Sequence, residues 1–465
     1  MDQRLLPRTL PVLLACAFSG AAGASGFQLL EQNASGLGNA YAGSAAVAED
    51  ASTIFYNPAG LAALPQGKNA VMAVNAINPS AKFSNSGISR TGGGTTLVGG
   101  IPTQTDFASS GTGGDAGSLA FVPAAYFAMS LDPKWTVGLG INAPFGLKTE
   151  YDDNWIGRFQ GIKSEMKTMN INPTVAYKAN DMVSIGFGLD YQKIDATLTK
   201  AVNFTAIIAG MSVPLAASVG NVEGRQELTG SDNSWGYNFG VTFKLSDRTR
   251  LGMAYRSAIK YQLTGTQTVA RPLTGNPTAD GGLASYANTK NQAVSLDLKM
   301  PDTFTTSVVQ KLDDKWEMMG DLSWTGWSKI QEIRVNFTAP GSTPDVTNWK
   351  LKDTWRVAFG GNYRYTDDMK FRFGVAYDQS PVPDIYRTVR LPDADRTWLS
   401  LGMQYKPTKQ SALDLGFTYI WVKSASINNN GEIPSNAAVG YARGLSNGSY
   451  NNNIAILGAQ YSANF

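Results

Sequence analysis

The chain has 465 residues, with 39 Lys and Arg against 36 Asp and Glu, one Cys and no His. This near-neutral charge gives no argument for a nucleic-acid partner. The absence of His removes the commonest general base and metal ligand, so we expect neither an enzyme nor a metal or cofactor site. No apolar run of about 18 residues follows the N-terminus, which excludes a transmembrane helix. The 49 Gly and the 11% aromatic content instead favour a β-barrel.

The first 24 residues predict a signal peptide. Arg4 and Arg8 precede a short apolar run, and Ala22-Gly23-Ala24 forms a small-residue cleavage site before Ser25. Cys16 loosely resembles a lipoprotein cysteine, but the apolar core before it is unusually short. Cleavage before Ser25 leaves a mature chain without Cys.

Residues 25–66 do not have the pattern of strands. They are rich in Gly and Ala, and Asn57-Pro58 and Leu64-Pro65 interrupt regular structure. This segment is either a periplasmic adaptor or a plug that folds back into the barrel. We favour the plug, because a barrel of this size encloses space that a plug can fill.

Residues 67–465 predict a transmembrane antiparallel β-barrel. Apolar side chains alternate with small or polar ones along several runs, for example from Trp135 to Phe145 and from Tyr237 to Leu245. Period two places the two sets on opposite faces of a strand. The runs suit a tilted strand that crosses a bilayer, and aromatic residues such as Trp316 and Trp421 suit its interfacial girdles.

The strand number follows from the connections. Six short polar turns separate alternating runs: Asp132-Pro133, Asn180-Asp181, Ser246-Asp247-Arg248, Asp313-Asp314, Thr366-Asp367-Asp368 and Pro407-Thr408-Lys409. Seven longer segments lie between these hairpins: 84–117, 146–165, 201–233, 267–291, 337–352, 380–395 and 428–450. Together they link about fourteen strands, with the short turns periplasmic. The terminal Phe465 resembles the signal that barrel assembly machinery reads, and we expect a monomer.

Several motifs resemble those of FadL-type outer-membrane transporters. Residues 35–43, which read Ser-Gly-Leu-Gly-Asn-Ala-Tyr-Ala-Gly, and Asn57-Pro58-Ala59 resemble the family's amino-terminal hatch. Further matches follow in order along the chain: Gly26–Leu29, Ala48–Ala51, Pro144–Glu150, Lys352–Arg356, Tyr377–Pro383 and Leu391–Arg396. The resemblance implies a fourteen-stranded barrel with a luminal hatch in the bacterial outer membrane. It implies transport of long-chain fatty acids or, in one branch, of small aromatic compounds.

Fatty-acid uptake is the first hypothesis, and uptake of aromatic hydrocarbons is its alternative within the family. A surface adhesin or structural barrel is a hypothesis from another class, and its long loops would bind a partner. An outer-membrane lipid enzyme is disfavoured by the missing His. The sequence does not decide between acid and hydrocarbon substrates.

A fatty acid needs an apolar groove for capture, because each buried methylene contributes about 0.8 kcal/mol. The apolar loop that contains Phe204, Ile207, Ile208 and Met211 resembles the family's extracellular groove. The alternative is a loop that is apolar only because it packs on its neighbours.

The ligand carboxylate needs a polar partner inside the barrel. Alternation predicts that Arg356, Arg372 and Asp378 face the lumen, and Asp378 matches an acidic residue of the family's inner pocket. Arg364 and Arg396 are expected to face the lumen as well. Lys350 lies near the family's pocket lysine, although the loop spacing differs. We expect at least one arginine to bind the carboxylate, with Arg356 favoured; the alternative role is an ion pair that holds the plug.

The gating hypothesis concerns the hatch and a break in the wall. Asn57 is expected to cap backbone groups where Pro58 prevents helix continuation, with Ala59 completing the motif. The family's hatch lies beside a kinked strand with a lateral exit, and Pro144 or Gly146 can supply that break. The alternative is that both residues simply end a strand.

Overall fold

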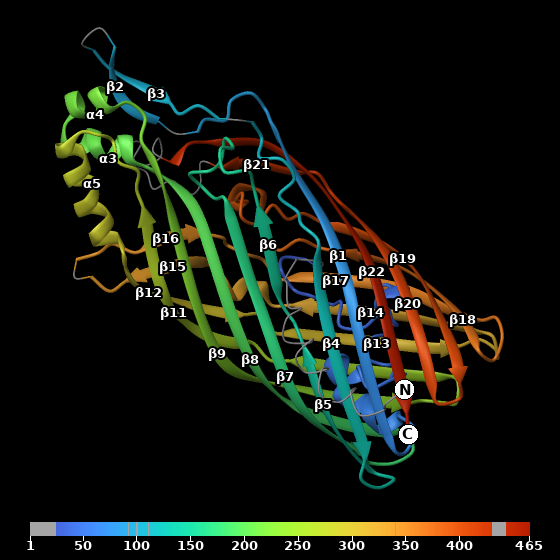
Figure 1. The fold of residues 1–465 in the computed structure, drawn as a ribbon. Coiled ribbons are helices and arrows are strands. Elements are labelled where there is room, and N and C mark those ends of the chain that lie inside the picture. The colour runs from blue at the N-terminus through green and yellow to red at the C-terminus, as the bar shows by residue number, and fades with distance from the viewer. Residues whose placement is uncertain (1–24, 92, 99–100, 110, 340, 430–442) are drawn as a thin grey trace, which may run out of the picture.

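The computed structural model describes residues 25–91, 93–98, 101–109, 111–339, 341–429 and 443–465. The predicted signal peptide, residues 1–24, lies outside this part of the chain. The described residues form a closed antiparallel barrel with fourteen wall strands (Figure 1). It closes where the first wall strand pairs with the last, from Asn69↔Asn464 to Asn85↔Gly448. The predicted fold class and strand number are confirmed.

Some wall strands are continuous, and others consist of two segments separated by a break. The continuous strands are β1 (Lys68–Asn85), β4 (Ala120–Ser130), β7 (Lys163–Lys178), β8 (Val183–Asn203), β9 (Glu223–Lys244), β18 (Met369–Asp378), β19 (Arg396–Thr408) and β22 (Ser446–Asn464). The two-segment strands are β5 (Trp135–Asn142) with β6 (Gly146–Glu150), β10 (Thr249–Arg256) with β11 (Ile259–Ala270), β12 (Gln292–Met300) with β13 (Thr303–Lys311), β14 (Trp316–Thr325) with β15 (Glu332–Phe337), β16 (Asp345–Asn348) with β17 (Thr354–Arg364), and β20 (Ser411–Val422) with β21 (Ala425–Asn429).

Helices and a small hairpin gather at the end of the barrel opposite the short turns (Figure 1). They are β2 (Gly93–Val98), β3 (Ile101–Asp106), α3 (Phe204–Met211), α4 (Val213–Val219) and α5 (Pro277–Lys290). The other helical turns are η1 (Leu37–Asn39), α2 (Thr53–Tyr56), η2 (Pro58–Ala63), η3 (Trp327–Lys329) and η4 (Asp384–Tyr386). None of the helices in the described ranges is long and apolar enough to cross a membrane.

The six predicted short turns each connect two consecutive wall strands. Their side chains explain why the chain turns there. Asp132 Oδ1 accepts hydrogen bonds from the backbone N–H groups of Lys134 and Trp135, at 2.7 and 2.8 Å. Asp313 makes the same pair of bonds in its own turn. These are Asx turns, in which a short polar side chain mimics a backbone turn.

The outer face of the wall is apolar. On β17, Trp355 and Phe359 are 47% and 62% exposed, while Arg356 and Ala358 between them are buried. Strands β18, β19 and β20 show the same alternation. An outward apolar band with polar groups turned inward is the pattern that a lipid-facing barrel requires.

Six of the seven segments predicted as loops include strand residues, and the predicted loop 380–395 is the exception. In 201–233 and 267–291 these residues lengthen the neighbouring strands. Residues 201–203 and 223–233 continue β8 and β9, and residues 267–270 continue β11. These outer strand ends carry polar residues on their exposed face, such as Thr266 and Thr268. The contrast between apolar and polar positions is lost there, and the prediction depended on that contrast.

Residues 25–66, hereafter the luminal segment, lie inside the barrel (blue in Figure 1). Leu37 and Tyr41 pack in one apolar cluster with wall residues such as Trp398 and Ile456. Glycines on the wall permit a close approach. A Cβ at Gly252 would lie 1.9 Å from the carbonyl oxygen of Ala45. The luminal segment therefore fits against backbone, with no side chain between.

Candidate functional site

An apolar cavity, hereafter the inner cavity, lies in the outer half of the barrel, and together with the space open to solvent at its mouth it measures about 1130 Å³. Its apolar walls come from alternate positions of β7, β8, β9, β11, β12 and β15, and the luminal segment supplies Phe27. The apolar lining residues are Phe27, Leu147, Phe159, Met166, Ala196, Leu198, Leu228, Leu263, Leu296, Leu298, Ile333, Val335 and Trp349. Such a surface gives a hydrocarbon chain a dry environment.

Charged side chains also line the inner cavity. Lys200 Nζ lies 3.1 Å from Asp345 Oδ2, and Arg443 Nη2 lies 3.1 Å from Asp345 Oδ1. A third cation, Arg390, donates to the backbone oxygens of Lys163 and Thr199. Two cations therefore share one carboxylate at the wall of an apolar cavity.

A second space, the outer cavity, shares Phe159, Lys200, Gln226, Asp345 and Arg443 with the inner cavity. Its remaining walls include residues of α3, α5, the end of β15 and the loop after it: Ala206, Ile207, Tyr286, Lys290, Phe337 and Thr343. The Lys200–Asp345–Arg443 cluster thus stands between the two cavities.

The predicted groove residues divide between two environments. Ile207 lines the outer cavity. Phe204 and Ile208 are fully buried in a cluster with residues of α5, such as Leu283. Met211 is 49% exposed and does not line this cavity. Packing on neighbours, the alternative raised from the sequence, accounts for Phe204 and Ile208.

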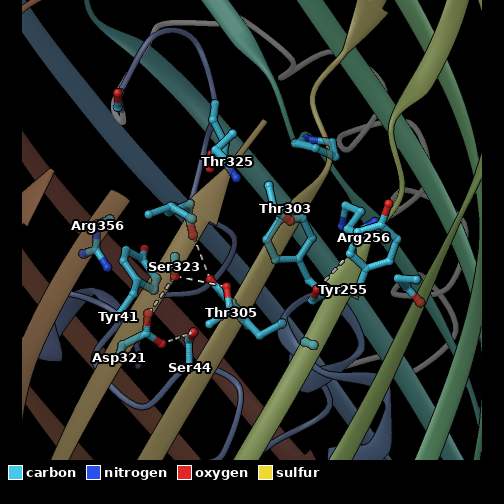
Figure 2. Close-up of a pocket in the computed structure, with 18 of the residues that line it drawn as sticks. Tyr41, Ser44, Tyr255, Arg256, Thr303, Thr305, Asp321, Ser323, Thr325 and Arg356 are labelled. Atoms are coloured by element: carbon cyan, nitrogen blue, oxygen red, sulfur yellow. Dashed lines mark hydrogen bonds between the residues drawn. The ribbon is translucent and has the colours of Figure 1, made fainter. Parts of the chain in front are cut away.

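Arg356 and Asp378 face the lumen, as alternation predicts, but they line a different cavity (Figure 2). That cavity has a mixed polar and apolar lining and lies beside the luminal segment. Arg356 Nη2 donates to the carbonyl oxygen of Ala40 at 2.5 Å, and its guanidinium lies over the ring of Trp398. Asp378 accepts from the backbone nitrogen of Ser25 at 3.1 Å. Both side chains hold the luminal segment.

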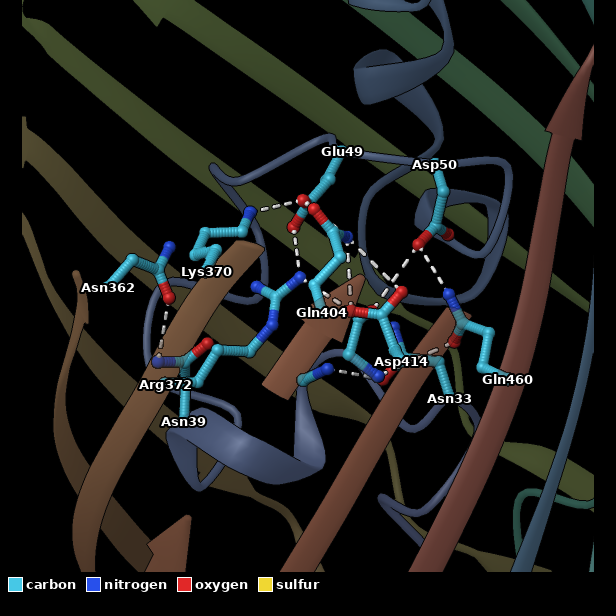
Figure 3. Close-up of polar contacts among 12 residues, drawn as sticks. Asn33, Asn39, Glu49, Asp50, Asn362, Lys370, Arg372, Gln404, Asp414 and Gln460 are labelled. Atoms are coloured by element: carbon cyan, nitrogen blue, oxygen red, sulfur yellow. Dashed lines mark hydrogen bonds and ion pairs between the residues drawn. The ribbon is translucent and has the colours of Figure 1, made fainter. Parts of the chain in front are cut away.

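Arg372 also binds the luminal segment (Figure 3). Its Nη2 lies 2.9 Å from Glu49 and 2.8 Å from Asp414, and Lys370 pairs with Glu49 as well. Burial raises the pKa of the Glu49 carboxyl, but the charges of Arg372 and Lys370 outweigh burial and hold that pKa well below its usual range. Glu49 is therefore an ionised anchor of the segment.

Lys350 is exposed and is not brought to the inner cavity. Its backbone has a positive φ of 46° and its N–H donates to Gln331. Its neighbours Thr347 and Trp349 line the cavity instead.

Asn57 has the predicted capping role and further contacts. Its Oδ1 accepts from Ala59 N at 3.0 Å, with Pro58 at the first position of η2. Its Nδ2 donates to the carbonyls of Ala45 in the luminal segment, and of Val241 and Met253 in the wall. One buried amide thus joins the luminal segment to two wall strands.

The wall is interrupted between β5 and β6, at Ala143, Pro144 and Phe145. The luminal segment pairs with the chain at this break. Leu29 N donates to Pro144 O at 2.8 Å, and Gly146 N donates to Phe27 O at 2.9 Å. The predicted strand break thus lies beside the luminal segment.

The three cations and the aspartate of the inner cavity were not predicted from the sequence: Lys200, Arg390, Arg443 and Asp345. Lys200 had a usable signal, because Ile194, Ala196 and Leu198 precede it at period two on one face of β8. Asp345, the first residue of β16, and Arg443 lie in segments that were predicted as loops, and no local pattern shows that these segments approach β8. Within the described ranges, no group of three His, Cys, Asp or Glu side chains is arranged to hold a metal ion.

Comparisons with known proteins agree with this architecture. Residues 15–465 match the model of the family described as "Outer membrane protein transport protein (OMPP1/FadL/TodX)". The long-chain fatty acid transport protein of Salmonella typhi is 31% identical over 442 residues, which cover 92% of this chain and 95% of that protein. A Pseudomonas aeruginosa FadL homologue has a similar crystal structure, with a TM-score of 0.80, 24% identity and coverage of 95% and 100%. The P. putida toluene transporter TodX has a TM-score of 0.61 at 17% identity, with coverage of 89% and 94%.

Proposed function

The chain belongs to the OMPP1/FadL/TodX family of outer membrane transport proteins, and from this premise we propose that its substrates are long-chain fatty acids. The family membership itself makes the protein a bacterial outer-membrane transporter of hydrophobic compounds and not an enzyme. The finer assignment depends on one observation, an apolar cavity with a cationic cluster in its wall.

The apolar part of the inner cavity fits a hydrocarbon tail. At about 0.8 kcal/mol for each buried methylene, the burial of ten such groups contributes roughly 8 kcal/mol before ordering costs. An aromatic hydrocarbon would gain from the same walls. It would leave Lys200 and Arg443 without a ligand partner.

The charged part fits a carboxylate. Asp345 occupies Lys200 and Arg443 in the absence of ligand. A fatty-acid carboxylate that passes from the outer to the inner cavity takes one of these two cations while Asp345 keeps the other, so each buried charge retains a partner during the step. Relatives named long-chain fatty acid transport proteins support the acid over the hydrocarbon.

In this proposal the luminal segment is the hatch. Phe27 lines the inner cavity, contacts Trp327 at 4.6 Å between ring centroids, and pairs beside the break at Pro144. A ligand that fills the inner cavity therefore contacts the part of the hatch that covers the break. Displacement of Phe27 uncovers the wall between Asn142 and Gly146, which gives a lateral exit to the membrane lipid.

The other predicted residues then hold the hatch in place or contribute to substrate capture. Arg356, Arg372 and Asp378 hold the hatch, Asn57 with Pro58 and Ala59 fixes its closed form, and Ile207 contributes to capture in the outer cavity. The exposed Phe465 remains the proposed recognition signal for barrel assembly machinery.

The test compares two ligands of equal length, oleate and oleyl alcohol, on purified variants. Lys200→Met should weaken oleate about ten- to a hundredfold and the alcohol little, since a charge-assisted hydrogen bond contributes about 1.5–3 kcal/mol. Arg443→Met should act in the same direction. Lys193→Met is the matched control, because Lys193 is an outward, 51% exposed lysine of the same strand. Equal losses of affinity for oleate and oleyl alcohol would show that Lys200 has only a structural role in the barrel wall, which would contradict the proposal.

A further inference from the structure

The luminal segment begins, at Ser25, beside two buried carboxylates, those of Asp378 and Asp393, hereafter the acidic pair. Ser25 is only 4% exposed. Its backbone nitrogen donates to Asp378 Oδ2 at 3.1 Å, and its hydroxyl donates to the carbonyl oxygen of Gln379. The next nitrogen, that of Gly26, donates to Asp393 Oδ2 at 2.9 Å. Two carboxylates therefore meet the chain at one point inside the barrel.

The acidic pair belongs to a group of charged side chains that extends across three neighbouring wall strands. Arg356 of β17 pairs in register with Asp378 of β18, which pairs with Arg396 of β19. Arg396 Nη2 also lies 2.5 Å from Asp393 Oδ1. All four side chains are at most 5% exposed. Their charges balance, two positive against two negative.

Glu31 disturbs this balance. It belongs to the luminal segment, is fully buried, and neither of its carboxylate oxygens has a hydrogen-bond partner. The charged groups that act on it are Arg396 and Arg356, and both guanidinium groups keep an unpaired buried N–H. When Glu31 loses its proton, which happens as pH rises through about 7, the cluster holds three acids and two bases and lacks one positive charge.

We propose that Asp378 and Asp393 form a binding site for the α-ammonium group of Ser25, created when the signal peptide is cleaved. Hydrolysis of the Ala24–Ser25 bond by a signal peptidase uses one water molecule. It leaves a carboxylate on Ala24 and an amine on Ser25, which takes up a proton at neutral pH because α-amines titrate near 7.7–8.0.

The ammonium group of Ser25 supplies the positive charge that the cluster lacks. An ammonium brings a full positive charge and further N–H donors to carboxylates that a neutral backbone N–H already hydrogen-bonds, and burial away from water strengthens that attraction. The ammonium is the third cation beside Arg356 and Arg396, opposite Asp378, Asp393 and Glu31. Cleavage of the signal peptide thus fixes the start of the luminal segment in the barrel. A chain that keeps its signal peptide lacks the ammonium and therefore this ionic contact.

The first test measures the reactivity of the α-amine in the purified processed protein. An amine-reactive ester near neutral pH labels free α-amines in preference to lysines, and mass spectrometry identifies the labelled site. The wild-type amine should label at least tenfold more slowly than that of Asp378→Asn. The labelling rate of the exposed Lys193 is the internal reference against which the rate of the α-amine is compared in each protein. Equal protection of the amine in both proteins would overturn the proposal, as would a mature chain that begins elsewhere than Ser25.

A second variant separates the charge from the hydrogen bond. One Gly inserted between Ala24 and Ser25 moves the ammonium by one residue, up to about 3.6 Å, and leaves a neutral N–H at Ser25. Limited proteolysis of the luminal segment is the readout. The insertion should speed cleavage several-fold, and Asp378→Asn should add little to it. If Asp378→Asn has the same effect with and without the insertion, the charge has no role.

Discussion

At the scale of single residues, the luminal segment is held by buried polar side chains that bind backbone. Asn57 satisfies four backbone groups, and Gly240 makes room for it, since a Cβ there would lie 1.9 Å from Asn57 Oδ1. The sequence predicted the cap to Ala59 from the Asn-Pro pair. The contacts to Val241 and Met253 could not be predicted, because they depend on two strands about 190 residues away in the chain.

Asn57→Ala tests this link. The variant should insert and stay heat-modifiable on a gel, because the wall pairs without Asn57. Fatty-acid uptake should fall, since the buried carbonyls of Val241 and Met253 lose their donor and the closed form of the segment is weakened. Uptake at the wild-type rate by a correctly inserted variant would remove the gating role.

Glu31 gives a pH prediction. Burial raises its pKa from 4.5 to about 7, against the opposing charges of Arg396 and Arg356. An acid with a raised folded pKa stabilises the fold below its unfolded pKa, and this contribution, at most about 3 kcal/mol, is lost as pH rises through 7. Thermal midpoints in detergent should therefore fall between pH 5 and pH 8 in the wild type.

Glu31→Gln should flatten this dependence, since a neutral amide takes up no proton. The comparison of slopes separates Glu31 from the other titrating groups. Parallel slopes for the two proteins would show that Glu31 does not titrate in this range.

At the scale of elements, the break between β5 and β6 is where the wall and the luminal segment share a ladder. Gln28 and Phe145 form an antiparallel pair flanked by the bonds Leu29 N–Pro144 O and Gly146 N–Phe27 O. Pro144 supplies no N–H to a ladder, so the sequence showed that a strand is interrupted here. It did not show that residues of the luminal segment complete the ladder, because their partner lies more than 100 residues away.

A disulfide across this pair tests the exit. Non-hydrogen-bonded antiparallel pairs have Cα atoms about 4.5 Å apart, which suits a disulfide. The doubly substituted chain, Gln28→Cys with Phe145→Cys, should lose uptake when oxidised and regain it on reduction. Each single variant is the control. Uptake that is the same in the oxidised and reduced forms would place the exit elsewhere.

At the scale of the whole molecule, the barrel was predictable and the binding site was only partly so. The fourteen strands follow from period two and from turns such as Asp132-Pro133 and Asp313-Asp314, which are local signals. The luminal charges Arg356 and Asp378 were assigned to the correct face. Their partners were not predictable, because alternation fixes a face and not the residue opposite. The Lys200–Asp345–Arg443 cluster joins three distant parts of the chain, and it forms only when the barrel closes.

The proposed function depends on the passage of fatty acids through the inner cavity. The most direct test measures the uptake of labelled oleate by a bacterial strain that lacks its own fatty-acid transporter and expresses the Ala196→Trp variant of this protein. Ala196 lines the inner cavity, and an indole there fills space that the hydrocarbon tail needs. Thr264→Trp, which places the same group on the exposed face of β11, is the matched control. Ala196→Trp should abolish uptake while Thr264→Trp retains it. Wild-type uptake by a correctly inserted Ala196→Trp variant would show that fatty acids do not pass through the inner cavity.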